Sequence, residues 1–361
     1  MTACAAQHNA TERPTSSASS GPRVISREFR TAIDAFVQAA MAKQHLAGVS
    51  LAIAQNGTIL YARGYGWRNV AKRLPASADT VYNIASISKQ FTAASVLLLQ
   101  QDGKLSLDDP LSKYLPSLRH AHEVSLLQML DHTSGLPDYL DLVDNNSLSY
   151  PVILAALKDA PLRFKPGTKF QYSNTNYVLM GPVVQQTSAE SFDGFLTRRI
   201  IRPLHLSSTS AGTTPIDMPN GARGYTVIKG KLVPTPLQAA AVAILDFPDG
   251  CVNSTVTDLV AWDAALDNGQ VVDQQNLHLM VTPGHYRAER RAWYGVGLEI
   301  TEVDGHREVF HQGQWTGYAG ENATFPDDGF DVVVLSNTDT FDEQQLVQRI
   351  FELFHTPLLL R

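Results

Sequence analysis

The chain has 361 residues, of which 44% are hydrophobic and 18% are charged, so it can bury a sizeable core and is not globally disordered. Its 29 basic and 35 acidic residues give a net charge of −6, and no basic run appears, which excludes nucleic acid as an expected partner. No apolar stretch reaches the roughly 18 residues that a membrane-spanning helix needs. We therefore expect a globular protein without a stable membrane span.

The first 22 residues form a segment of a different character from the rest. They are rich in Ser, Thr, Ala and Pro, which predicts a disordered tail (1–22) ahead of one composite domain (23–361). The tail lacks the apolar core of a signal peptide. The compartment is thus left open: cytoplasmic if this N-terminus is native, or extracytoplasmic if a leader has been removed. Cys4 lies in the tail and Cys251 far along the chain, so we expect neither a structural disulfide nor a cysteine-based metal site.

The two ends of the domain carry the pattern of an antiparallel sheet. Apolar residues at helical spacing predict a helix over 27–45, and two strands follow at 48–54 and 59–66, joined by the turn Asn56-Gly57. Near the other end we expect four further strands and a closing amphipathic helix. These lie at 294–302, 307–311, 318–325, 331–336 and 341–354.

Between these ends the pattern becomes mainly helical. Helices are predicted at 90–101, 126–130, 151–157, 177–187, 191–201 and 257–266. Residues 213–250 hold many Pro, Gly and Ala, and we interpret them as a long loop beside a cleft. The predicted fold class is α+β: a sheet part (23–80 and 290–361) flanked by helices, with an inserted helical part (81–289). A cleft between the two parts is the natural place for a site.

Ser86-Ile87-Ser88-Lys89 is the first candidate for chemistry. It follows a β-prone segment and opens a predicted helix, so the serine and the lysine lie on one helical face. Unpaired backbone N–H groups at a helix start favour a developing anion. A serine nucleophile with a neighbouring amine is a known arrangement, but the four-residue pattern arises often by chance and needs partners.

Two later segments supply such partners. Tyr172 offers a phenol that could relay a proton, and Asn174 offers a donor and an acceptor for an amide-like group of a substrate. His311-Gln312-Gly313-Gln314 ends a predicted strand, and its glycine permits close backbone approach. An edge strand here could pair with a substrate and offer the N–H of Gln314 to an oxyanion.

The order of these three segments resembles the superfamily of penicillin-binding proteins and class C β-lactamases. Within it, the chain is most similar to the β-lactamase-related esterases, D-amino-acid peptidases and carboxypeptidases. The resemblance covers roughly 29–353 and implies a β-lactamase/transpeptidase-like fold and a periplasmic or other extracytoplasmic location. Further segments that resemble the family lie at 82–86, 105–110, 130–137 and 164–167.

Carried over by position, the resemblance implies a role for each matching residue. Ser86 is the acylated nucleophile. Lys89 and Tyr172 together remove the proton of Ser86 and protonate the leaving group; which of the two is the base stays open. Asn174 holds the acyl-side amide of the substrate. His311 and Gly313 occupy the third motif, and the N–H groups of Ser86 and Gln314 form the oxyanion hole.

Two departures from the family pattern bear on the substrate. Classical β-lactamases carry a lysine where this chain has His311, which is mostly neutral at pH 7, so the grip on a substrate carboxylate weakens. The turn 249–253 replaces a small, glycine-rich turn, and we expect an effect on local packing only. The predicted function is a serine hydrolase that cleaves a small ester or a D-amino-acid-type amide or peptide.

Several alternatives stay open beside this prediction. They are a β-lactamase or DD-carboxypeptidase acting on β-lactams or peptidoglycan peptides, an acyltransferase, and a non-catalytic penicillin-binding-like protein. We expect a small-molecule ester, amide or short peptide as partner and no cofactor, while the oligomeric state is unknown. No metal is expected, since His120, His122 and His132 lack zinc-protease spacing; nucleotide-binding and α/β-hydrolase motifs are also absent from the sequence.

Overall fold

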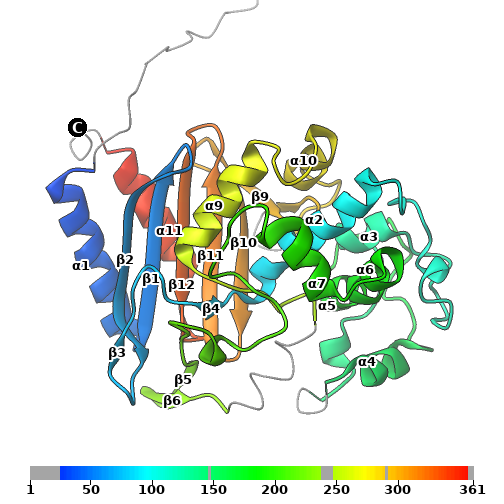
Figure 1. Cartoon of the computed structure of the whole chain (residues 1–361), viewed down its shortest axis with the longest axis horizontal. Coiled ribbons are helices and arrows are strands. Elements are labelled where there is room, and N and C mark those ends of the chain that lie inside the picture. The colour runs from blue at the N-terminus through cyan, green and yellow to red at the C-terminus, as the bar shows by residue number, and fades with distance from the viewer. Residues whose placement is uncertain (1–24, 145–147, 237–246, 289–291, 357–361) are drawn as a thin grey trace, which may run out of the picture.

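The computed structural model describes residues 25–144, 148–236, 247–288 and 292–356, so the predicted tail lies outside the described residues. Its centre is an eight-stranded antiparallel sheet in the order β3-β2-β1-β12-β11-β10-β9-β8. The first long strand, β1, pairs with the last, β12, over residues 49–55 (Figure 1). The prediction of an α+β fold with a sheet built from both chain ends is therefore confirmed. The strands are β1 (Gly48–Gln55), β2 (Thr58–Asn69), β3 (Leu74–Pro75), β8 (Trp293–Tyr294), β9 (Glu299–Val303), β10 (His306–Trp315), β11 (Tyr318–Phe325) and β12 (Phe330–Ser336).

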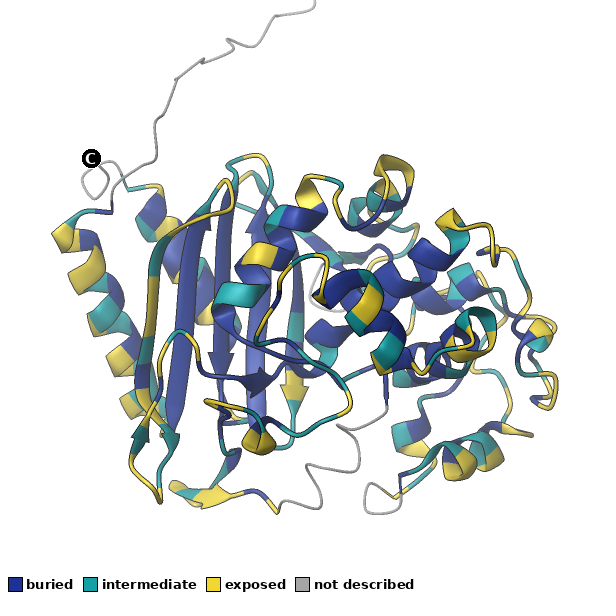
Figure 2. Cartoon of the chain, viewed as in Figure 1, coloured by how far each residue is buried: buried dark blue, intermediate teal, exposed yellow. Residues whose placement is uncertain are grey.

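Both faces of the sheet are covered by helices, because alternate side chains of a strand point to opposite faces. In β1, Leu51 and Ile53 join the apolar cluster of α1 (Arg27–Gln44) and α11 (Glu343–Phe354), whereas Ala52 belongs to the cluster of α2 (Ser88–Gln101) and α9 (Val256–Asp267). The central strands are accordingly buried throughout (Figure 2). This two-sided core holds β10 and the start of α2 in fixed positions.

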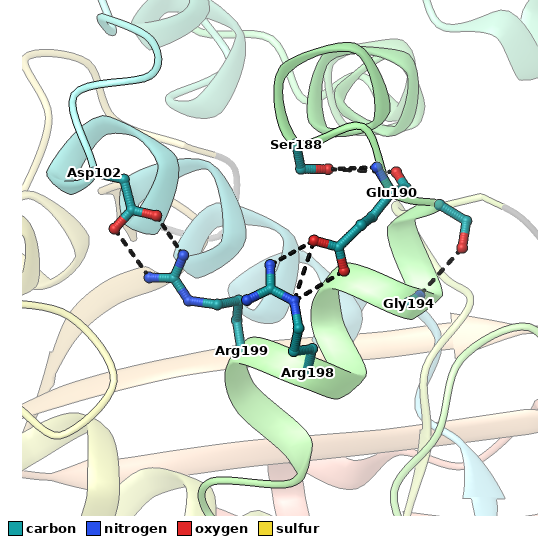
Figure 3. Close-up of polar contacts among 7 residues, drawn as sticks. Asp102, Ser188, Glu190, Gly194, Arg198 and Arg199 are labelled. Atoms are coloured by element: carbon teal, nitrogen blue, oxygen red, sulfur yellow. Dashed lines mark hydrogen bonds and ion pairs between the residues drawn. The ribbon is translucent and has the colours of Figure 1, made fainter.

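The rest of the helical part packs around α2. Its helices are α3 (Leu126–Leu130), α4 (Tyr150–Leu157), α5 (Asn174–Val178), α6 (Met180–Ser188), α7 (Phe192–Leu196) and α10 (Gln274–Val281). Arg199 binds Asp102, the residue that ends α2, and the adjacent Arg198 forks onto Glu190 (Figure 3). Such exposed pairs contribute at most about 1 kcal/mol each, so the apolar core dominates the stability. None of the described helices is long and apolar enough to cross a membrane.

Several predicted boundaries were wrong for identifiable reasons. The strand expected over 294–302 is split into β8 and β9, because Gly297 adopts φ 82° close to α2. By contrast, the helix expected over 191–201 is present, as α7 continued by a π-helical turn, Thr197–Ile201. The loop expected over 213–250 contains the hairpin of β5 (Tyr225–Ile228) and β6 (Lys231–Pro234), while 237–246 lie outside the described residues. The division into 23–80, 81–289 and 290–361 stays a prediction.

Candidate active site

Ser86 sits in a short turn that the surrounding residues hold rigidly. It lies in the 3-10 helix Ala85–Ile87, immediately before α2, and is half-buried. The preceding Ala85 adopts φ 47°, a left-handed conformation that is uncommon without a glycine. Asn83 supports this turn: its Oδ1 accepts the N–H of Ala85 at 3.0 Å and its Nδ2 donates to the carbonyl of Gly250 at 2.9 Å. The serine hydroxyl is thereby presented at a fixed place.

Lys89 lies one turn along α2 and is fully buried. Its Nζ donates to Ser86 Oγ at 2.9 Å, to Asn174 Oδ1 at 2.9 Å and to the main-chain oxygen of Asp249 at 2.8 Å. Burial lowers the pKa of the Lys89 amine to about 8, against the opposing charges of Asp249 and Asp138. A substantial fraction of the amine is therefore unprotonated just above neutral pH and can accept a proton from Ser86.

Tyr172 completes the first group of side chains. The Nζ of Lys89 lies 5.0 Å from the centre of its ring, and Tyr172 and Ser86 line the same cavity. Burial raises the pKa of the Tyr172 phenol well above its usual range, although the neighbouring Ser86 hydroxyl opposes this shift. The phenol consequently stays protonated, which suits a proton donor better than a base.

Asn174 links the lysine to a carboxylate. Its main-chain N–H and its Nδ2 both donate to Asp138 Oδ2 at 2.9 Å, while its Oδ1 accepts from Lys89. Asp138 therefore fixes which way the amide faces, since the oxygen must point to the amine. The second hydrogen of Asn174 Nδ2 is not used in these contacts and can be donated to a substrate carbonyl.

β10 brings the third motif against the serine. A methyl group added to Gly313 would lie 2.2 Å from the carbonyl oxygen of Ile84, so only glycine lets the strand approach so closely. On one side, β10 pairs with β9 over residues 306–310 only. Beyond Phe310, no described strand pairs with β10 on the side of β9. The predicted edge strand is thus present over 311–315, next to Ser86.

His311 is buried and neutral. Its Nδ1 donates to the carbonyl of Gln312 at 2.6 Å, and its Nε2 accepts the hydroxyl of Tyr294 at 3.0 Å. Burial, together with the charge of Lys89, lowers the pKa of His311 to about 3. The imidazole therefore cannot supply the fixed positive charge of a lysine at this position.

Two cavities meet at the serine. One of about 100 Å³ includes Tyr139, Asp249 and Trp315, and the other of about 300 Å³ includes Tyr172, Tyr294 and His311. Both are lined by Ser86, Asn174 and Gln314. A larger cavity of about 390 Å³ among the helices shares none of these residues and has no lysine among the described residues that line it. A substrate with groups on two sides of a carbonyl fits the junction at Ser86.

Comparison with known proteins agrees with this arrangement. The family model described as "Beta-lactamase" matches residues 33–354. The chain belongs to the β-lactamase family. It is 29% identical over 342 residues to the protein named "Protein flp" of Staphylococcus aureus (strain N315), covering 90% of this chain but only 66% of that relative.

Two solved structures of relatives show the same fold. The octameric penicillin-binding protein homologue from Pyrococcus abyssi has a TM-score of 0.81 and 27% identity, covering 90% of this chain and 77% of that one. The D-amino acid amidase from Ochrobactrum anthropi SV3, in complex with L-phenylalanine amide, has a TM-score of 0.78 and 25% identity, covering 91% and 98%. The β-lactamase-type fold implied by the sequence resemblance is therefore confirmed.

The structure brings all seven site residues predicted from the sequence to one region. It also shows further residues in this region that the motifs did not indicate. Asp249, expected to affect only local packing, holds Lys89 through its main-chain oxygen and accepts the hydroxyl of Tyr139 at 3.0 Å. Burial raises the pKa of its carboxyl group, while Lys89 opposes this shift. Asp249 lies in the turn 249–253, which departs from the pattern of the β-lactamase family; this departure was the sequence signal that could have indicated its contact with Lys89.

His132 is a second site residue that the motifs did not indicate, and its ring packs against the ring of Tyr172. The two rings lie 4.4 Å apart at 31°. His132 Nδ1 accepts the N–H of Ser173 at 3.2 Å and Nδ2 of Asn176 at 3.0 Å. His120 instead pairs with Glu123 on the surface, so these two histidines do not converge on one ion.

Proposed function

We propose that this member of the β-lactamase family is a serine hydrolase that works through an acyl-enzyme on Ser86. The observation that carries the proposal is the contact of Lys89 Nζ with Ser86 Oγ at 2.9 Å, combined with a lysine pKa lowered to about 8. A buried amine of this kind activates a hydroxyl that is otherwise a poor nucleophile. Lys89 is a better base than Tyr172, because the phenol remains protonated.

The reaction follows from the positions of these groups. Lys89 takes the proton of Ser86 while Oγ bonds to the substrate carbonyl carbon, and the carbonyl oxygen gains the negative charge. The N–H groups of Ser86 and Gln314 stabilise that charge. The bond to the leaving group then breaks, with its proton supplied from Tyr172, which is restored by the proton on Lys89. Water repeats the sequence on the acyl-enzyme and releases the acid.

The lining of the two cavities favours a substrate without a carboxylate. No lysine or arginine is among their described lining residues, and His311 is neutral. β-Lactams and peptidoglycan peptides carry a carboxylate that a fixed positive charge would hold. We therefore propose small carboxylic esters or amides of D-amino-acid type as substrates, a choice supported by the likeness to a D-amino acid amidase.

The test combines labelling with turnover. Wild-type protein is treated with p-nitrophenyl acetate, D-alanyl p-nitroanilide and a chromogenic cephalosporin, and the acyl-enzyme is detected by intact-protein mass spectrometry. We expect an ester or anilide adduct that Ser86→Ala removes. Ser173→Ala is the matched control, because this buried serine in the same site has no proposed chemical role.

The other candidate functions give distinct results in the same experiment. Cephalosporin turnover faster than that of the ester or anilide would support a β-lactamase and contradict the argument from His311. Absence of an adduct and of Ser86-dependent turnover with all three compounds would support the non-catalytic alternative.

A further inference from the structure

Three side chains from distant parts of the chain converge at the end of α11, away from the serine. They are His306 at the start of β10, Asp328 in the turn between β11 and β12, and His355, which ends α11. One ligand atom from each lies within 4.8 Å of the others. His306 Nδ1 is 2.7 Å from Asp328 Oδ2, and His355 Nε2 is 3.3 Å from Asp328 Oδ1. Two imidazoles and a carboxylate are typical ligands of a transition metal.

The hydrogen bonds of His355 favour a ligand role for its outer nitrogen. Its Nδ1 lies 3.0 Å from the carbonyl oxygen of Phe351, an acceptor only, so Nδ1 carries a proton. In the neutral ring, Nε2 then presents its lone pair towards the carboxylate oxygen of Asp328. Two lone pairs 3.3 Å apart require a proton or a cation between them. A backbone carbonyl that fixes the far nitrogen is also the usual support of a metal-binding histidine.

Packing holds the two rings in place. Phe351 contacts both: its ring centre lies 5.2 Å from that of His306 and 4.2 Å from that of His355. The two imidazole centres are 4.7 Å apart. The negative end of the α11 dipole also lies here, which favours a cation. The site therefore has oriented ligands and a favourable local field.

We propose that His306, Asp328 and His355 bind one divalent transition-metal ion of the Zn²⁺ type. In a tetrahedral zinc site, bonds of about 2.0–2.2 Å place ligand atoms about 3.3–3.6 Å from one another. His355 Nε2 and Asp328 Oδ1 are at the short end of this range, whereas the 2.7 Å contact of His306 Nδ1 with Asp328 Oδ2 lengthens when the ion enters. Water fills the fourth position. Without the ion, His306 Nδ1 donates to Asp328 Oδ2; when the ion binds, this proton is replaced, the ring carries its proton on Nε2, and Nδ1 becomes the ligand atom. The ion would join the end of α11 to β10 and to the β11–β12 turn, so its role is structural and independent of Ser86.

The test uses untagged, chelator-treated full-length protein at about pH 8, where histidine side chains are generally neutral. Titration calorimetry with ZnCl₂ is expected to show one ion per chain with a micromolar or lower Kd, and Zn²⁺ is expected to raise the Tm. His355→Gln and Asp328→Asn should each weaken binding at least tenfold and abolish the rise in Tm. Co²⁺ should give visible d–d absorption bands in the wild type that His355→Gln removes.

A surface pair of similar geometry provides the control. His120 lies 2.7 Å from Glu123, as His306 does from Asp328, but the His120 pair is not part of a three-ligand group among the described residues. His120→Gln should leave Zn²⁺ binding unchanged. Far-UV circular dichroism and ester turnover check that the variants are folded. A wild-type Kd above about 1 mM, or equal affinity in wild type, His355→Gln and Asp328→Asn, would overturn the proposal.

Discussion

The close approach of β10 to the serine turn predicts a sharp effect of Gly313→Ala. The new methyl carbon would start 2.2 Å from the carbonyl oxygen of Ile84, whereas real contacts of this type are longer than 3.0 Å. The strand or the turn must therefore move by about 1 Å. Because Ile84 lies two residues before Ser86, and Gln314 directly follows Gly313, this movement changes the spacing of the two N–H groups proposed to hold the oxyanion.

The size of the effect follows from what such a displacement costs. Loss of one oxyanion donor lowers kcat about 10²–10³-fold, and a 1 Å misplacement costs about 10²-fold. We expect kcat/KM for p-nitrophenyl acetate to fall about 10²-fold, with a loss of unfolding free energy of about 1–3 kcal/mol from overpacking.

Gly250→Ala is the matched control for Gly313→Ala. Its methyl carbon would meet Ala85 at 3.9 Å, an ordinary contact on the same serine turn. Stopped-flow acylation and urea unfolding should therefore show little change in this variant. A Gly313→Ala enzyme that acylates within threefold of the wild type would refute the reasoning.

Three further predictions concern the charges around the serine. kcat/KM should rise with pH through an apparent pKa near 8, because Lys89 must lose a proton to act as base. Asp249→Asn should move this pH profile to lower pH, since the substitution removes a negative charge that stabilises the ammonium form of Lys89. A profile of Asp249→Asn that stays in place or moves to higher pH would contradict this. Lys89→Met should slow acylation about 10²–10⁴-fold, and an unchanged acylation burst would instead favour Tyr172 as base. His311→Lys should raise the ratio of cephalosporin to ester kcat/KM, measured on the same enzyme; a lower ratio would argue against carboxylate recognition at this position.

The sequence predicted the parts of the site that lie in ordered motifs. Ser86 and Lys89 share a helical face by spacing alone, and the structure places them in hydrogen-bond contact. Tyr172 and Asn174 come from a loop far along the chain, and only the resemblance to a family indicated that this loop returns to the serine. Motif order, more than periodicity, therefore indicated the candidate site.

The remaining parts depend on contacts that a linear pattern does not show. Asp249 reaches Lys89 through a main-chain oxygen, and any residue type offers that atom. His132 is buried behind Tyr172, and its spacing alone does not indicate this neighbour. The hairpin 225–234 was missed because it falls in a segment rich in Pro, Gly and Ala, although the Lys229-Gly230 turn was a usable signal.

The pairing of β1 with β12 also has a consequence for the newly synthesised chain. The serine turn emerges from the ribosome long before β10, which must lie against the carbonyl of Ile84. β12, which joins the two ends of the sheet, emerges later still. An incomplete chain therefore carries Ser86 and Lys89 without the strand proposed to stabilise the oxyanion. Acylation of Ser86 should accordingly mark only finished, fully closed molecules, which makes a serine-directed probe a reporter of complete folding.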